Sequence, residues 1–239
     1  MNIGFYTGAS GLVAYQSDMN VVGNNIANSN TPGYKPDTDT FEDLLHYKMY
    51  VNNTSQPLQG TGTRNVMTGM KMEQGALQHT KSDLDYALLG DGFFAVDNNG
   101  TPAYTRCGAF EAANDGTGTY YLADQAGHFI LNAQGGRIPL ERDPTVGVFH
   151  DVSQQIGVFR FPNPESLTQL SDNLYAENTA SGQPEVANTE IRNGYLEQSG
   201  TKLVEEMSNL IMAQRGYQLS ARVLQANNEV ADVINNLRS

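Results

Sequence analysis

The sequence predicts an α+β protein with a long helix at each end of the chain and an antiparallel β domain between them. Residues 1–30 and about 199–239 carry apolar side chains at helical spacing. Residues from about 75 to 195 are instead rich in Gly, Asn, Thr and Tyr, and their short apolar runs alternate with turn residues. We therefore expect a helical terminal domain (1–33 and 196–239), a connector (34–74) and a β-rich domain (75–195).

The N-terminal segment carries an apolar stripe whose members follow one another at steps of 3 and 4: Phe5, Gly8, Leu12, Tyr15, Met19, Val22 and Ile26. This heptad spacing is typical of a helix that lies along another helix. Pro32 cannot extend the helix and disfavours helical geometry in the residue before it, so the helix should end near residues 28–31. Pro32 and Gly33 fit the two central positions of a type II turn.

The C-terminal segment carries two stripes. The first runs at steps of 4 and 3 through Leu203, Met207, Leu210, Gln214, Tyr217, Ala221, Leu224, Asn228, Ala231 and Asn235. The second consists of Val223, Val230, Val233, Ile234 and Leu237. The acidic residues Glu205 and Glu206 complement the dipole at the start of this helix.

A stripe alone does not distinguish packing within one chain from packing between copies. A helix with two stripes, however, needs two neighbours, because an exposed stripe of that length would be an aggregation surface. The two-sided pattern of the C-terminal helix therefore favours packing between copies.

The middle of the chain shows strand and turn signals. The apolar run Phe93-Phe94-Ala95-Val96 is followed by Asn98-Asn99-Gly100, which indicates a hairpin. Similar turns at Asn114-Asp115-Gly116 and Gly135-Gly136 predict an antiparallel β domain. In the connector, Phe41, Leu44 and Leu45 are spaced for one short helix.

Composition and motifs exclude several classes of function. The net charge of −12, with no Lys/Arg cluster, argues against a nucleic-acid partner. A single cysteine, Cys107, excludes an internal disulfide framework and a multi-cysteine metal site. The N-terminus lacks the pattern of a cleavable secretory signal, so we expect either a cytoplasmic protein or one exported with its N-terminus intact.

An enzymatic function finds no support in the sequence, and we expect no catalytic residue, metal or cofactor. The histidines His46, His79, His128 and His150 are scattered, and no zinc-ligand pair, nucleophile elbow, Walker loop or dinucleotide fingerprint is present. The close carboxylate pairs Asp83/Asp85 and Glu205/Glu206 have the spacing of solvated loop and helix-start residues. A hydrolase that degrades the cell wall is therefore a remote alternative, and a small-molecule substrate is not expected.

Two long segments near the ends of the chain carry extended motifs. The first is Ser10-Gly11-Leu12-Val13-Ala14-Tyr15-Gln16 together with residues 19–35, which include Asn24-Asn25-Ile26-Ala27-Asn28-Ser29-Asn30-Thr31-Pro32-Gly33-Tyr34-Lys35. The second comprises Asn193-Gly194-Tyr195-Leu196-Glu197-Gln198-Ser199, Val204-Glu205-Glu206-Met207 and Ala213-Gln214-Arg215-Gly216-Tyr217-Gln218. Both segments resemble flagellar rod and hook proteins. Residues 84–96 and Ala103-Tyr104-Thr105-Arg106 are similar to the β domain of the FlgF/FlgG rod proteins and favour these over the longer hook protein.

Three features depart from the family pattern. The connection over residues 48–63 is short for a distal rod subunit, which leaves distal against proximal open. Cys107 and Gly216 stand where other small residues are usual, and the glycine weakens the helix by roughly 1 kcal/mol.

The resemblance implies a structural axial subunit of the bacterial flagellar basal-body rod. It further implies terminal helices paired as an inner coiled-coil-like layer, helical self-assembly that transmits torque, and export through the flagellar type III apparatus without a cleaved signal peptide. The implied partners are copies of the chain, neighbouring rod and hook subunits, and the surrounding ring proteins. The alternative is another axial or cap-like component of the flagellum, which would bind a filament end rather than form helical arrays.

The candidate site residues fall into two groups. Helix packing and polymerisation are assigned to Leu12, Tyr15, Met19, Val22, Ile26, Leu203, Met207, Leu210, Tyr217, Leu224, Val230 and Ile234. The family-motif turn consists of Asn28, Asn30, Thr31, Pro32, Gly33 and Tyr34. The asparagines from Asn24 to Asn30 fit either hydrogen bonds to neighbouring backbone in a packed layer or simple capping of the helix end.

Overall fold

A computed structural model describes residues 3–48, 58–114, 116, 118–141, 149–171 and 173–238 of the chain. These residues form two compact units. Unit 1 comprises residues 1–27, 37–68 and 202–239, and unit 2 comprises residues 28–36 and 69–201. Residues 37–68 thus group with the terminal helices, within the stretch expected to be a separate connector, and residues 49–57 lie outside the described part.

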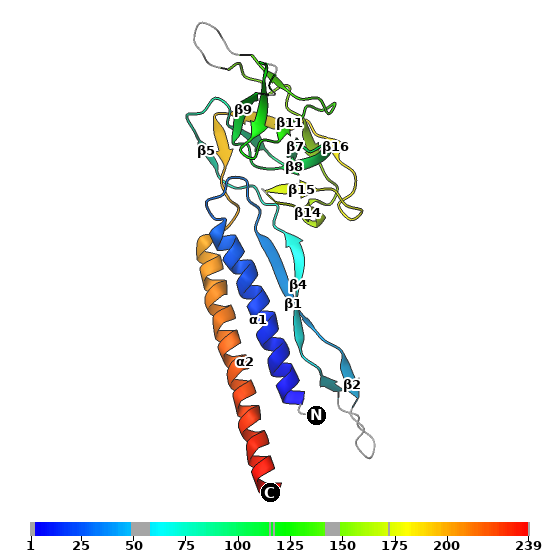
Figure 1. Cartoon of the computed structure of the whole chain (residues 1–239), viewed down its shortest axis with the longest axis vertical. Coiled ribbons are helices and arrows are strands. Elements are labelled where there is room, and N and C mark those ends of the chain that lie inside the picture. The colour runs from blue at the N-terminus through cyan, green and yellow to red at the C-terminus, as the bar shows by residue number, and fades with distance from the viewer. Residues whose placement is uncertain are drawn as a thin grey trace. The chain divides into compact units, whose positions relative to one another are not determined.

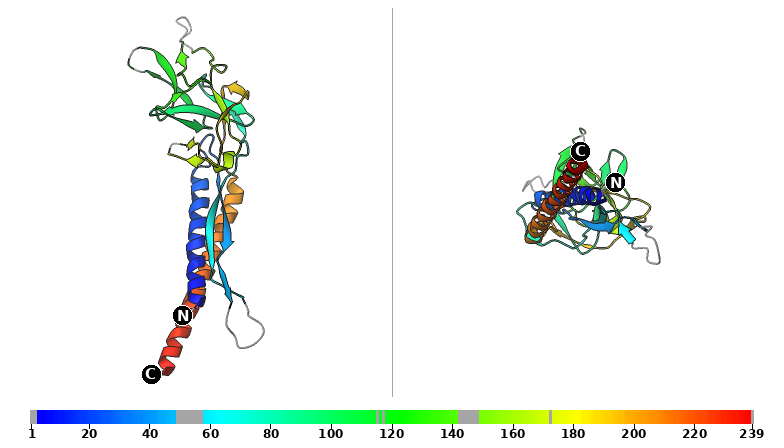
Figure 2. Two further views of the ribbon diagram at one scale, coloured as in Figure 1. Left: turned by 90° about the vertical axis from the view of Figure 1, so that its right-hand side faces the viewer. Right: turned by 90° about the horizontal axis from the view of Figure 1, so that it is seen from below.

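Unit 1 is built on two helices, α1 (Ile3–Ala27) and α2 (Leu203–Arg238), which lie side by side (Figures 1 and 2). The two helices are antiparallel, because Gly4 of α1 lies against Asn227 of α2, whereas the later residue Gly8 lies against the earlier residue Leu224. The predicted end of the first helix is confirmed to within one residue, since α1 stops at Ala27. Gly4, near the start of α1, lies against Asn227, and α2 continues past this point, as the red end of the ribbon shows in Figure 1.

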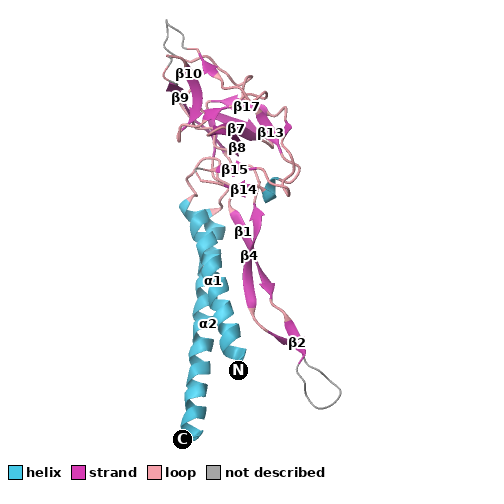
Figure 3. Cartoon of the chain, turned by 45° about the vertical axis from the view of Figure 1, so that its right-hand side comes forward, coloured by secondary structure: helices cyan, strands magenta, loops and turns pink. Residues whose placement is uncertain are grey.

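The same unit contains two small sheets. Strand β1 (Asp37–Asp43) pairs with β4 (Thr63–Met70), whose last two residues group with unit 2, and β2 (His46–Lys48) pairs with β3 (Leu58–Gly60) (Figure 3). The predicted short helix over Phe41, Leu44 and Leu45 is therefore wrong. The alternating Asp-Thr-Asp-Thr sequence before Phe41 favours an extended strand, because β-branched threonine fits a pleated surface and aspartate is a poor helix former.

Unit 2 is an antiparallel β structure, as predicted. Its largest sheet has the strand order β12-β10-β11-β7-β8-β15-β14, with β9 on β10, β13 on β7 and β16 on β13. Separate two-stranded sheets pair β17 with β6 and β18 with β5. The bounds are β5 (Leu77–His79), β6 (Tyr86–Leu89), β7 (Phe93–Asn98), β8 (Thr101–Thr105), β9 (Phe110–Asn114), β10 (Tyr120–Asp124), β11 (Phe129–Ile130), β12 (Pro139–Leu140), β13 (Val158–Arg160), β14 (Thr168–Gln169), β15 (Leu174–Ala176), β16 (Glu185–Val186), β17 (Glu190–Asn193), β18 (Tyr195–Glu197) and a 3₁₀ turn, η1 (Pro164–Ser166).

Strand β7 explains how this unit forms its core. Alternate residues of a strand face opposite sides, so Phe94 and Val96 enter one apolar cluster while Phe93 and Ala95 enter another. The continuous apolar run of β7 is thus the pattern of a strand buried on both faces. Each fully buried phenylalanine side chain contributes about 1.5–3 kcal/mol relative to an exposed one.

The predicted hairpin after β7 is confirmed. Asn98 pairs with Thr101, and the two loop residues have positive φ angles, 53° at Asn99 and 88° at Gly100. These angles match the type I′ turn, whose twist suits adjacent antiparallel strands. The turn at Asn99 and Gly100 therefore lies where the Asn-Gly pair predicts it.

Candidate assembly surface

Small residues lie where α1 and α2 approach each other most closely. Gly8, Gly11 and Ala14 are buried on α1. A Cβ atom on Gly11 would lie 3.0 Å from the Ser220 hydroxyl of α2. Because these positions lack bulky side chains, the two helix backbones approach closely.

Tyr15 lies in the contact of this helix pair. Its ring lies against Gly216 of α2, where a Cβ atom would come within 2.4 Å of the ring. On its other side the Tyr15 ring packs against Phe41 of β1, with 5.0 Å between ring centroids. The glycine that weakens α2 locally is therefore the residue that makes room for Tyr15.

The structure divides the residues predicted to pack the helices into two classes. Those that are buried or half-buried within the chain are Leu12, Tyr15, Met19, Val22, Ile26, Leu210 and Leu224. Those that are exposed are Leu203, Met207, Tyr217, Val230 and Ile234. The second class is available to contact another molecule.

Exposed apolar side chains concentrate on α2. Among the residues that the structure describes, twelve of the twenty-two large exposed apolar side chains lie on this helix. A group of them recurs at steps of 7, 4 and 3 on one side of α2, and we call it the outer stripe: Met212, Leu219, Val223, Val230, Ile234 and Leu237. Their exposed fractions run from 47% at Val223 to 84% at Leu237.

The outer stripe contains most of the second stripe predicted from the sequence. A neighbouring exposed side of the same part of α2 carries polar residues instead: Gln218, Arg222, Gln225 and Glu229. A contiguous apolar stripe beside a polar side marks a surface that binds another protein surface.

Asn25 joins three elements inside unit 1. The side chain is 2% exposed, and its amide donates to the Asp37 carbonyl of β1 at 3.0 Å and to Glu206 Oε1 of α2 at 3.3 Å. Its Oδ1 accepts from the Asp37 backbone N–H at 3.0 Å. Asn25 therefore bonds neighbouring backbone, as one of the two interpretations held, but the backbone belongs to its own chain.

The family-motif turn follows α1 directly. Thr31 N–H donates to the Asn28 carbonyl at 3.1 Å, and Tyr34 N–H donates to the Thr31 carbonyl at 3.3 Å. Gly33 has φ +68°, which confirms the type II turn predicted at Pro32 and Gly33. Any side chain on Gly33 would also meet the backbone of Arg106 and Cys107 at about 2.6 Å.

The remaining turn residues lie in different environments. Tyr34 is buried, whereas Asn30 is exposed. Asn28 Oδ1 accepts from the Thr31 hydroxyl at 3.2 Å, a local bond of the kind that closes a helix end. The Pro32 carbonyl accepts from the side-chain amide of Asn173 at 3.1 Å, which ties the turn to the β structure of unit 2.

A buried ion network joins the two ends of unit 2, which follow α1 and precede α2 in the chain. The Glu197 carboxylate accepts from Lys35 Nζ at 2.7 Å and from Arg106 Nε at 2.6 Å, and these three side chains are at most 5% exposed. Burial lowers the pKa of Lys35, and the Glu197 charge opposes that shift. The backbone adds two bonds between the ends, from Gly33 N to Glu197 O at 2.8 Å and from Gly200 N to Tyr34 O at 2.9 Å.

Sequence reasoning missed this network, although each of its charges lay inside a segment that carries the family resemblance. No periodicity connects residues 35, 106 and 197, so only the fold brings them together.

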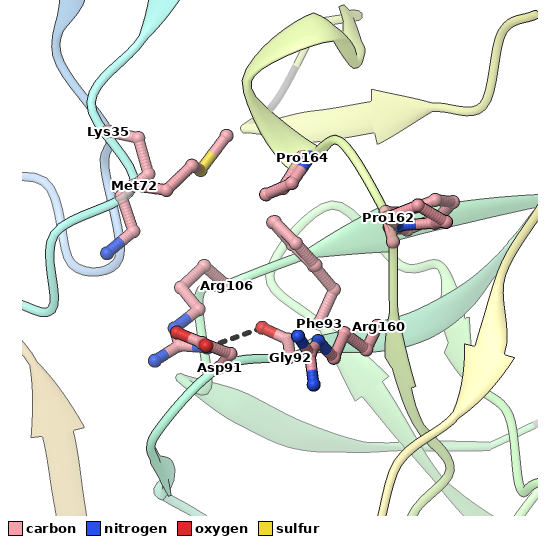
Figure 4. A pocket seen from close by; sticks show the side chains of 10 residues that line it. Lys35, Met72, Asp91, Gly92, Phe93, Arg106, Arg160, Pro162 and Pro164 are labelled. Atoms are coloured by element: carbon pink, nitrogen blue, oxygen red, sulfur yellow. Dashed lines mark hydrogen bonds between the residues drawn. The ribbon is translucent and has the colours of Figure 1, made fainter. Parts of the chain in front are cut away.

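A pocket of about 220 Å³ opens beside the ion network (Figure 4). Besides Lys35 and Arg106, its walls carry an aromatic and proline surface and a second pair of charges. These lining residues are Met72, Asp91, Gly92, Phe93, Arg160, Phe161, Pro162 and Pro164. Glu197 and the carbonyls of Glu73, Gly90 and Gly92 already bind the two buried cations, so the network serves to hold the fold together.

The titratable residues considered for catalysis form local contacts. His128 pairs with Asp124 at 2.8 Å inside the turn between β10 and β11, and His46 pairs with exposed Asp43 at 3.2 Å. Cys107 is a half-buried free thiol. Within the described residues, no three His, Cys, Asp or Glu side chains come together as metal ligands, and neither helix combines the length and apolar character needed to cross a membrane.

Comparisons with known proteins agree with the residues that carry the resemblance. Residues 5–35 match the family model described as flagella basal body rod protein, and residues 192–237 match the one described as flagellar basal body rod FlgEFG protein C-terminal. The chain is 32% identical to the flagellar basal-body rod protein FlgG of Bacillus subtilis, over 98% of each chain. It is 34% identical to the rod protein FlgF of Caulobacter vibrioides, over 94% of this chain and 93% of the relative.

Proposed function

The chain belongs to the family of flagellar basal-body rod proteins, and we propose that it is a rod subunit that joins its neighbours through the outer stripe of α2. A structural role in the rod follows from this membership. The proposal concerns the surface by which one copy meets the next.

The outer stripe is the single observation that carries the proposal. It combines heptad spacing with side chains that are 47% to 84% exposed in the described chain. Heptad spacing is the pattern that lets one helix pack along another by placing apolar side chains into holes of its partner. The partner we propose is a terminal helix of a neighbouring subunit, in an inner layer shaped like a coiled coil.

Repetition of this contact would build a polymer. The outer stripe and the surface it meets are different patches, and such heterologous contacts generate helical arrays when the rotation does not close a ring. Continuous helix packing along the axis gives the array stiffness and register, which a shaft that transmits torque requires. The partners are therefore copies of this chain and neighbouring rod and hook subunits.

The test places one negative charge on the outer stripe. Val230 is 57% exposed, so Val230→Asp should leave the isolated subunit folded but should put an unpaired carboxylate into the contact between copies. The matched control is Gln225→Asp, which adds the same charge on the polar side of α2.

We expect Val230→Asp to abolish motility and incorporation of the subunit into purified basal bodies, in a strain that lacks its own copy of the gene. Gln225→Asp should support both, and circular dichroism of the two purified variants should match the unaltered protein. Normal basal bodies built with Val230→Asp would show that the stripe is not the contact surface.

A further inference from the structure

The sequence contains two asparagines that directly precede a glycine, Asn99 and Asn193. Asparagine is a chemically labile residue, because the backbone nitrogen of the next residue can attack its side-chain carbonyl carbon. A glycine at that next position favours the attack, since it has no side chain in the way and its backbone adopts many conformations. The two Asn-Gly pairs share this reactive sequence, so the fold decides which of them reacts.

The first pair forms the exposed tip of the hairpin between β7 and β8. The Asn99 side-chain amide donates to Asn98 Oδ1 at 3.2 Å, and the Gly100 N–H donates to Asp97 Oδ1 at 2.7 Å. Both bonds lie at the surface, where water replaces a broken hydrogen bond at small net cost. A Cβ atom on Gly100 would meet no atom within 4 Å, so the tip has room to move.

The second pair is held by β structure. Asn193 is the last residue of β17 and pairs with Tyr86 of β6. Its side-chain amide donates to the Asp83 carbonyl at 2.7 Å, and the Gly194 N–H donates to the Asp85 carbonyl at 2.8 Å. Both reacting groups are therefore bound to the backbone that leads into β6. A reaction at Asn193 requires this sheet to separate, whereas a reaction at Asn99 requires only the opening of a loop tip.

We propose that Asn99 is a modification site, which converts spontaneously into aspartate and isoaspartate in the folded protein while Asn193 persists. The Gly100 nitrogen forms a bond to Asn99 Cγ, the Cγ–Nδ2 bond breaks, and ammonia leaves with the proton that the Gly100 nitrogen loses. Water then adds to one of the two carbonyl carbons of the cyclic imide and opens it. No atom is oxidised or reduced, and the proposal does not rest on the rod function.

The isoaspartate product changes the backbone of the hairpin. Its main chain runs through the former side-chain carbon, which adds one methylene group to a loop of two residues. A type I′ turn no longer fits this longer loop. Because β7 carries Phe93 into one apolar cluster and Phe94 into the other, we expect the conversion to lower the stability of unit 2.

The experiment ages the purified full chain at mildly alkaline pH, both folded and unfolded in guanidinium chloride. Peptide mass mapping follows the two asparagines, and an isoaspartate-specific methyltransferase labels the rearranged product. In the folded chain we expect Asn99 to convert about tenfold faster than Asn193, or more. In guanidinium chloride the two rates should be similar, because the shared Asn-Gly sequence then decides them. The reaction should be slower at neutral pH, since the attacking nitrogen must lose its proton.

The matched variant is Asn99→Gly, which removes the reactive amide and retains a Gly-Gly pair that suits the type I′ turn. The aged variant should carry no isoaspartate at this position and should unfold at the same urea concentration as fresh variant. The unaltered chain should unfold at a lower urea concentration after ageing than before.

Two results would overturn the proposal. One is an Asn99 that stays intact in the folded chain under conditions that convert it in guanidinium chloride, because the turn would then protect the side chain. The other is equal conversion of Asn99 and Asn193 in the folded chain, because the fold would then not select between the two sites.

Discussion

The interiors of the two units are filled in opposite ways. Unit 2 buries large side chains such as Phe94, Leu122 and Tyr175 almost completely, and its ion network satisfies the charges that are buried with them. The helix pair of unit 1 instead approaches closely at Gly8, Gly11 and Gly216, and twelve large apolar side chains of α2 remain exposed. Unit 2 therefore fills its interior with its own side chains, whereas unit 1 leaves apolar side chains exposed for a partner.

The largest expected effect lies in the interior of unit 2. Glu197→Ala would leave Lys35 and Arg106 buried without their counter-charge, and breaking a buried ion pair in this way costs about 3–5 kcal/mol. Urea unfolding should show this loss in the free energy of unfolding. The exposed Glu190, which pairs loosely with Arg192 at 3.6 Å, is the control, and Glu190→Ala should change stability by less than about 0.5 kcal/mol.

A Glu197→Ala variant as stable as the unaltered protein would show that the ion network does not hold the two ends of unit 2 together. The interior of unit 2 would then not depend on satisfying its buried charges.

A smaller effect tests whether the close approach of the helices is required. Gly216→Ala should lower stability by about 1–3 kcal/mol, because the added methyl group overlaps the Tyr15 ring and this overpacking outweighs the better helix propensity of alanine. Gly23 of α1 has open space around its Cα atom, so Gly23→Ala should raise stability by about 0.5–1 kcal/mol. Thermal unfolding at 222 nm measures both.

Opposite signs for these two glycine substitutions are the decisive outcome. A stabilising Gly216→Ala would mean that Tyr15 can move aside at little cost, and that the helix pair does not depend on close backbone approach.

The smallest effect concerns the outer stripe in an isolated copy. Leu219 is 60% exposed, so Leu219→Asn should change the free energy of unfolding by no more than about 0.5 kcal/mol. Sedimentation at increasing concentration should at the same time show weaker self-association than in the unaltered protein. A large loss of stability would place Leu219 in the interior of unit 1 and would contradict the view that the outer stripe is exposed in an isolated copy.

Local patterns in the sequence predicted the elements well. Heptad spacing located both long helices, Pro32 and Gly33 located the turn after the first of them, and Asn99-Gly100 located a hairpin. Each of these features is determined within a few neighbouring residues. The strand at Phe41 differs from the predicted helix because three apolar residues at steps of 3 and 1 imitate helical spacing, whereas the β-branched threonines beside them favour an extended strand.

The contacts between distant segments could not be predicted in the same way. A search for large apolar residues selects Leu12, whereas the helices approach each other closely at Gly11 and Gly216, since the missing side chains are what allow the approach. The partners of Asn25 on β1 and α2, and the meeting of residues 35, 106 and 197, depend on the folded path of the chain. That the five exposed members of the predicted packing residues contact other copies stays a prediction.

The unequal lengths of the two helices have a practical consequence. The C-terminal end of α2 lies beyond the point where α1 begins, and it exposes Val233, Ile234 and Leu237 to water. This end of the helix adds nothing to the contact between α1 and α2. We therefore expect its exposed apolar side chains to promote self-association of the purified subunit. Buffer conditions that keep the subunit monomeric should therefore be chosen to suppress association through the C-terminal end of α2, rather than through the β structure.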